Sequence, residues 1–289
     1  MISVGPLEAA YRARRRARLV AGLAGAVLLL AGLLVSSWIS EAYPSSLIAG
    51  APRVGEYFAK LVPDLRLHAL WHDTQTQGSL AYWMYRLDSW LWLLFETTQI
   101  AALATLSGAA FGLLLCFPAA ANLAPSRFVY LAFRRTLELF RCVPDIVYAL
   151  ILVWTFGVGP LAGILAIALH TVGALGKLFS EVVENADMRP WDGVRSAGGN
   201  WQQAVHYAIL PQVMPNFLSY VLLRFEINVR GATVIGFVGA GGIGQELYSV
   251  ISFNYYQEIS AIIVLIIVSV SVIDITSEKL RTLAIGRGA

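Results

Sequence analysis

The sequence is poor in charge. Asp, Glu, Lys and Arg make up 13% of its 289 residues, whereas a soluble globular chain carries roughly 25%. Hydrophobic residues account for 57%, and the mean hydropathy is +0.66. So few charges cannot cover a soluble surface, which excludes an ordinary soluble enzyme and a disordered chain. The net charge of +3 gives no indication of nucleic-acid binding.

Cysteine is also scarce. Cys116 and Cys142 both lie in apolar surroundings, cannot build a disulfide framework, and are expected to be buried thiols. His68 and His72 stand four residues apart without an HExxH pattern, so we expect a solvated turn there and no metal site. No nucleophile–base constellation supports a membrane enzyme.

Long stretches without any Asp, Glu, Lys or Arg occupy residues 19–40, 97–126, 146–176, 231–245 and 259–273. The first is too long for the apolar part of a signal peptide, so we interpret it as a retained first span. A Gly-Val-Gly-Pro break at 157–160 predicts a hairpin between two spans. We therefore predict an all-α polytopic membrane bundle with six transmembrane helices, at about 19–40, 93–118, 129–156, 160–183, 212–236 and 256–276.

The placement of basic residues predicts the orientation. If the N-terminus lies inside, 15 of the 21 Lys and Arg residues fall in the inner segments or in the adjoining parts of spans 129–156 and 160–183. Because cytoplasmic loops carry an excess of these residues, both termini are expected in the cytoplasm. The polar segment 41–90 then lies outside, and the tyrosines and tryptophans between 82 and 92 mark its return to the membrane.

Two motifs resemble nucleotide sites without completing them. Residues 239–244 match GxGxxG, but a predicted membrane span precedes them instead of a strand. Residues 171–178 have Thr171 and Leu178 where a phosphate loop needs Gly and Ser or Thr. We therefore expect this chain to bind neither a dinucleotide nor ATP.

The inner segment 184–211 is the most informative. Pro190 can start a short helix and Gly198 can end it, whereas Asn200 with Gln203 forms a predicted capping box for a second helix. Apolar side chains are then available on this helix pair at Trp191, Val194, Trp201 and Val205. Physical reasoning leaves two interpretations open: a docking surface for a partner protein, or an amphipathic loop on lipid headgroups.

This spacing resembles the cytoplasmic loop of ATP-binding-cassette (ABC) importer permeases, EAA-x3-G-x9-I-x-L-P. Asp192 takes the Glu position, Gly198 the Gly, and Leu210-Pro211 the closing pair, whereas Gly193 and Val194 replace the two Ala and Ala208 replaces Ile. The resemblance implies a coupling helix seated in a cleft of an ATPase subunit. The coupling residues it implies are Trp191, Asp192, Arg195, Gly198, Trp201, Leu210 and Pro211.

Further motifs narrow the resemblance to phosphonate-type permease subunits, a subfamily that includes phosphite and hypophosphite importers. They lie at 210–215, 224–230, 232–234 and 238–244, and the similarity covers about 93–285. The implied organisation is a span with a periplasmic segment at 1–92 and a permease core at 93–289. The implied partners are a second copy, an ATPase dimer that binds ATP and magnesium, a periplasmic binding protein and membrane lipid. This chain itself would be non-catalytic, would hold no cofactor and would lie in a bacterial inner membrane.

Charges inside predicted spans are candidates for the substrate path, because ionisable groups at membrane depth are costly and face cavities or pair with one another. Arg141–Asp145 and Arg224–Glu226 are the ion pairs that the spacing allows. Arg230 has no obvious partner of its own, because Glu226 could pair with either Arg224 or Arg230, and it is our first candidate for a group facing an oxyanion. The predicted path residues are Arg141, Arg224, Glu226, Arg230, Gly239, Gly241 and Gly242.

Two alternatives remain at this point. The same kind of importer could carry methionine or a quaternary amine, the latter favouring aromatic cages over arginines. An ion-coupled secondary transporter is the other possibility, although such proteins commonly show inverted repeats.

Overall fold

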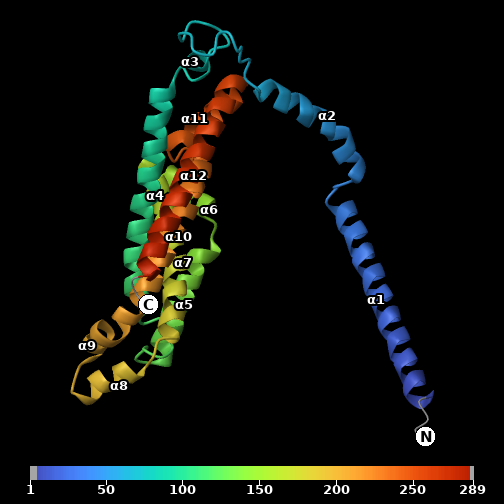
Figure 1. Cartoon of the computed structure of the whole chain (residues 1–289). Coiled ribbons are helices and arrows are strands. Elements are labelled where there is room, and N and C mark those ends of the chain that lie inside the picture. Colours follow the sequence, from blue (N-terminus) through green and yellow to red (C-terminus); the bar gives the residue numbers. More distant parts are fainter. Residues whose placement is uncertain (1–4, 287–289) are drawn as a thin grey trace. The chain divides into compact units, whose positions relative to one another are not determined.

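The computed structural model describes residues 5–286, and every regular element in that range is a helix (Figure 1). The chain divides into two compact units between Lys60 and Leu61. The first unit contains α1 (Gly5–Ile39) and α2 (Pro44–Leu61). Within α1, Ala10–Ile39 has a hydropathy of 2.5, which agrees with a first membrane span.

The second unit is a helical bundle that includes residues 61–92 as well as the predicted permease core. Its longer α-helices are α4 (Leu87–Cys116), α5 (Arg127–Cys142), α6 (Asp145–Phe156), α7 (Pro160–Glu184), α10 (Leu210–Ile235), α11 (Gly242–Ser252) and α12 (Tyr256–Gly286). Short elements are α3 (Leu80–Trp83), α8 (Arg189–Ser196), α9 (Trp201–Ala204), the π-helix Val205–Ile209 and the 3-10 turn Gly236–Val238. Over the described residues, four helices could each cross a membrane alone, and two bent pairs bring the number to six.

The third predicted span, 129–156, is not one helix. It is broken into α5 and α6, which meet at 83°. Pro144 disfavours helical backbone at the residue before it, and Val143 accordingly has the extended angles φ −82° and ψ 123°. The prediction of a continuous span was wrong at this proline.

The fifth span continues beyond its predicted end. After α10 the chain makes a 3-10 turn and then runs on as α11, with a bend of 47°. Gly239, Gly241 and Gly242 all have positive φ between these helices, a conformation that glycine adopts without steric cost. The eleven-residue α11 that follows this glycine turn was not predicted.

The hairpin predicted at 157–160 is present. Gly157 and Gly159 have φ values of +87° and +151°, and α7 starts at Pro160. The span predicted at 160–183 therefore agrees with α7.

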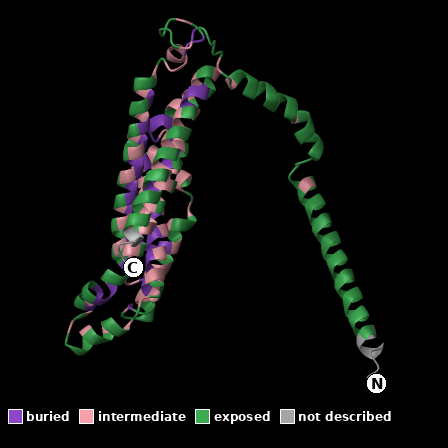
Figure 2. Cartoon of the chain, viewed as in Figure 1, coloured by how far each residue is buried: buried purple, intermediate pink, exposed green. Residues whose placement is uncertain are grey.

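The core of the bundle lies where α4 and α7 approach each other closely. A Cβ on Gly112 would lie 3.0 Å from the main-chain nitrogen of Gly176, and a Cβ on Gly108 would overlap Thr171. Figure 2 shows buried residues along this bundle. Cys116 belongs to the core, but Cys142 is exposed at the end of α5, so the expectation of two buried thiols was half wrong.

Candidate functional site

The first candidate site is the helix pair at one end of the bundle, opposite α3 (Figure 1). Gly198, with φ +87°, follows α8 and lets the chain turn. The predicted capping box is confirmed, because Asn200 Oδ1 accepts from the Gln203 amide and Gln203 Oε1 accepts from the Asn200 amide, both at 2.8 Å. The segment predicted from local spacing thus forms two separate short helices.

The apolar side chains that we expected to be available to a partner mostly pack against the bundle. Val205 is buried, and Trp191 and Trp201 pack against a core cluster that includes Phe179 and Ile209. The Trp201 indole N–H also donates to the Leu123 carbonyl at 3.0 Å. The expectation that these side chains form the exposed surface was wrong, because they cover the base of the bundle.

Polar groups make up most of the exposed surface of this helix pair. Asp192, Arg195 and Gly198, three of the predicted coupling residues, are exposed, and Arg195 donates to the Gly199 carbonyl at 3.0 Å. The closing pair starts α10, with Leu210 partly buried and Pro211 exposed. The other exposed residues include Ser196, Gln202, His206 and Tyr207.

His206 and Tyr207 were missed by the sequence analysis. They lie in the π-helix, and the Tyr207 side chain is 70% exposed. A π-turn adds one residue to a helical turn and so changes which side chains face outward. No local spacing rule predicts such an insertion.

The joint between α7 and α8 is tied to α10. Gln212 donates to the carbonyls of Ala208 and Asp187, and its Oε1 accepts from the Asp187 amide. Hydrogen bonds from Arg189 lower the pKa of the Asp187 carboxyl below its usual value. The start of the helix pair is therefore tied to α10, the helix that follows the pair in the chain.

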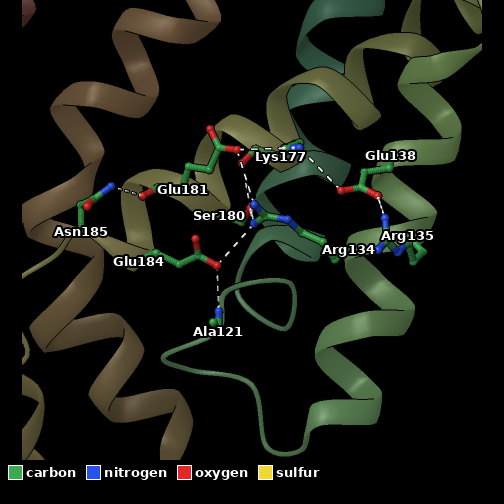
Figure 3. Close-up of polar contacts among 9 residues, drawn as sticks. All are labelled: Ala121, Arg134, Arg135, Glu138, Lys177, Ser180, Glu181, Glu184 and Asn185. Carbon is green, nitrogen blue, oxygen red and sulfur yellow. Dashed lines mark hydrogen bonds and ion pairs between the residues drawn. The ribbon is translucent and has the colours of Figure 1, made fainter.

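A network of three cations and three carboxylates joins α5 to α7 near this end (Figure 3). Arg134 donates to Ser180 Oγ at 2.9 Å and lies 3.3 Å from Glu184 and 3.4 Å from Glu181. Glu184 also accepts from the main-chain amide of Ala121. On the other side of the network, Glu138 pairs with Arg135 and with Lys177.

The second candidate site is a set of polar groups inside the bundle. Asn228, which is 2% exposed, donates to Thr105 at 2.8 Å and to Thr171 at 3.0 Å, joining α10 to α4 and α7. Next to it, Arg224 donates to His170 Nδ1 at 2.5 Å and approaches Thr171 at 3.4 Å. These partners come from different helices, so no spacing along one helix could predict them.

Neither Arg224 nor Arg141 has a carboxylate at ion-pair distance in the described part of the chain. Arg224 does not pair with Glu226, and Arg141 does not pair with Asp145, although the spacing allowed both pairs. Asp145 acts on Arg224 and His170 electrostatically from farther away. His170 also contacts the main chain of Arg141.

Arg230 is paired, contrary to the sequence-based expectation. Its guanidinium contacts Glu226 at 2.5 Å and Asp274 of α12 at 2.8 Å. Asp274 was missed because it lies 44 residues away in sequence. Two carboxylates therefore surround this arginine.

The predicted path glycines lie elsewhere, in the half of the bundle that contains α11. Gly241 and Gly242 line a cavity of about 370 Å³ together with Glu96, Gln245 and Glu246. Gly239 accepts a main-chain hydrogen bond from Gly159 at 2.8 Å, which links it to the α6–α7 hairpin. The structure does not bring these glycines to the Arg224 set.

A multi-span helical bundle with charged side chains inside its spans and an exposed helix pair at one end defines a membrane transport subunit as the class of protein. Residues 108–283 match the model of the family "binding-protein-dependent transport system inner membrane component". The chain belongs to this family. It is a multi-pass membrane protein and a permease component of a transport system.

Curated relatives include the phosphite transport system permease protein PtxC of Stutzerimonas stutzeri, 39% identical over 67% of this chain and 70% of the relative. The putative phosphite transport system permease protein HtxC of the same organism is 32% identical over 90% of this chain and 86% of the relative.

A solved structure, titled "Inward facing conformations of the MetNI methionine ABC transporter", has a TM-score of 0.59 at 18% identity. The match covers 68% of this chain and 95% of that one. The predicted all-α fold of the type I ABC importer permease is confirmed by this likeness.

Proposed function

We propose that this chain is the permease subunit of an ATP-driven importer that carries phosphite or phosphonate-type oxyanions inward across a bacterial cytoplasmic membrane. The observation that carries the proposal is the sequence likeness to permeases named for phosphite transport, over most of the chain. Two copies would form the pathway, and both termini would lie in the cytoplasm. A periplasmic binding protein would deliver the solute to the side where α3 and α11 lie.

The ATPase subunits would bind at the exposed α8–α9 pair. This assignment is supported by the exposed polar surface of the pair, by the hydrogen bonds from Gln212 of α10 to Asp187, and by the hydrogen bond from Trp201 to Leu123 in the connection between α4 and α5. The chain also runs directly from α7 into α8 through residues 185–188, and from α9 through the π-helix into α10. A force on Asp192 or Tyr207 would therefore move α7 and α10 together. The partner would bind and hydrolyse ATP with magnesium, whereas this chain would hold no cofactor and catalyse no reaction.

The oxyanion would meet Arg224 rather than Arg230. Arg230 already contacts two carboxylates, which repel an anion. Arg224 lies beside the neutral donors and acceptors of His170 and Thr171. A guanidinium with free donor positions matches the oxygens of phosphite and phosphonate.

Transport into proteoliposomes tests the proposal. The chain is reconstituted with its ATPase and binding protein, and uptake of radiolabelled phosphite or methylphosphonate is measured with ATP inside or outside the vesicles. ATP on the ATPase side should drive uptake that ionophores leave intact. Uptake that needs an ion gradient and no ATP would refute the proposal, and uptake of methionine or choline instead would refute the substrate class.

Crosslinking tests the docking surface separately. A cysteine at Ser196 should crosslink to the ATPase subunit in the assembled complex, because this residue is exposed on α8. A cysteine at Phe128, which is exposed at the start of α5 and outside the helix pair, is the matched control. An ATPase crosslink from position 128 but not from position 196 would contradict the assignment.

A further inference from the structure

Helix α2 has two contrasting faces. At 100° per residue, Leu47, Val54 and Phe58 fall on one side, and Arg53, Glu56 and Lys60 fall on the opposite side. Ile48 and Ala51 extend the apolar side. Leu47 is 78% exposed and Phe58 is 62% exposed, so nothing in the described first unit covers this face.

The start of α2 is held close to the end of a membrane span. Ile39 ends α1 and Pro44 starts α2, so their Cα atoms lie within about 18 Å of each other, at most 3.6 Å per residue. Trp38 and Tyr43 flank this connection. Aromatic residues of this kind lie at the level of lipid headgroups. The apolar face therefore begins where hydrocarbon gives way to water.

The charge on the polar face indicates what covers the helix. Arg53 and Lys60 outnumber Glu56, which gives this face a net positive charge. An apolar stripe opposite a basic face is the pattern of helices that lie in a membrane surface, with the apolar side in the headgroup–acyl boundary and the cations toward lipid phosphates. Eighteen residues give a length of about 27 Å, at 1.5 Å per residue.

We propose that α2 is an interfacial helix whose apolar stripe, from Leu47 to Phe58, is buried in the lipid leaflet at which α1 ends. The lipid surface itself covers this stripe. The helix would hold the first span beside the membrane surface and keep the chain between α1 and the bundle close to the bilayer. This inference rests on the first unit alone and is independent of the transported solute.

Spin labels on the full-length protein in liposomes of phosphatidylethanolamine and phosphatidylglycerol test the proposal. In a variant with Cys116 and Cys142 changed to Ser, single cysteines replace Val54 or Phe58 on the apolar face, and a cysteine at Glu56 serves as the matched control two residues away. Labels at 54 and 58 should collide with oxygen several-fold more than with a water-soluble nickel chelate, and the label at 56 should show the reverse. A scan over 45–60 should show the helical period.

Two results would overturn the proposal. Equal nickel accessibility on both faces would show a helix in water, and protection of position 54 from both reagents would show that protein covers the stripe. A second variant guards against effects of the label itself. Phe58→Asp should raise nickel accessibility at position 54, whereas Glu56→Asp should leave it unchanged.

Discussion

Neutralising Arg224 should impair transport, whereas neutralising Arg230 should impair stability. Arg224→Gln removes a charge that contacts only neutral groups, among the described residues, within hydrogen-bond distance. Arg230→Gln removes a charge held between Glu226 and Asp274. The first variant is therefore expected to lose transport and keep its stability, and the second to lose stability.

The magnitudes follow from the contacts. A hydrogen bond to a charged group contributes about 1.5–3 kcal/mol, which corresponds to roughly a 10- to 150-fold change in binding. If the Arg224 guanidinium makes one such hydrogen bond to the oxyanion during transport, Arg224→Gln should lower oxyanion uptake by at least about tenfold. The lost contact with His170 costs only about 0.6 kcal/mol, an average value for membrane proteins, and removal of a buried charge offsets it.

Arg230→Gln leaves two carboxylates without their cation. Removing one partner of a buried pair costs about 3–5 kcal/mol, and the 49% exposure of the Arg230 side chain reduces this to about 1–3 kcal/mol. Unfolding by SDS in mixed micelles measures the free energy, and uptake is normalised to the amount of folded protein. The reasoning is refuted by an Arg224→Gln protein that transports normally, or by one that is destabilised as much as Arg230→Gln.

Three more predictions concern packing and anchoring. Gly244→Ala should prevent normal folding, because the added Cβ would overlap the main-chain oxygen of Thr233. At Gly193 the added Cβ has open space, so Gly193→Ala should be neutral or stabilising by up to about 1 kcal/mol. The yield after detergent extraction and the melting temperature compare the two variants. Trp201→Phe keeps an aromatic ring, although a smaller one, and loses the hydrogen bond to Leu123. It should cost at least about 1 kcal/mol and lower the number of solutes imported per ATP hydrolysed, and an unchanged ratio would argue against a role for this bond in coupling. Arg134→Ala should lower the free energy of unfolding in SDS by about 1–2 kcal/mol, because the Arg134 side chain is 15% exposed and lies between two carboxylates. Arg135→Ala should lower it by less than about 0.5 kcal/mol, because the Arg135 side chain is 75% exposed. Equal losses would contradict the view that Arg134 joins α5 to α7.

Helix positions were largely predictable because hydropathy and helix-breaking residues are local signals. The Gly157 turn and the Asn200 capping box act over a few residues, and both are present in the structure. The break at Pro144 was equally local, but the predicted span 129–156 ran through this proline. The π-helix before Leu210 depends on packing against the bundle, for which no short pattern exists.

The candidate site was predictable only as a set of residue types. Spacing along one helix suggests partners three or four residues away, and it correctly placed Glu226 within reach of Arg230. It could not predict Asp274 or His170, because these partners come from other helices. The choice between Arg224 and Arg230 therefore needed the tertiary structure.

The break between α5 and α6 changes the electrostatics inside the bundle. Each helix end carries about half an elementary charge, negative at the C-terminus and positive at the N-terminus. Arg141 lies in the last turn of α5 and Asp145 in the first turn of α6, so each side chain has a helix end of opposite sign beside it. The two helix ends therefore stabilise both charges, which explains why Arg141 and Asp145 form no ion pair. Arg224 lies in the interior of α10 and has no helix end to balance it, so its positive potential is available to the oxyanion that we propose to pass there.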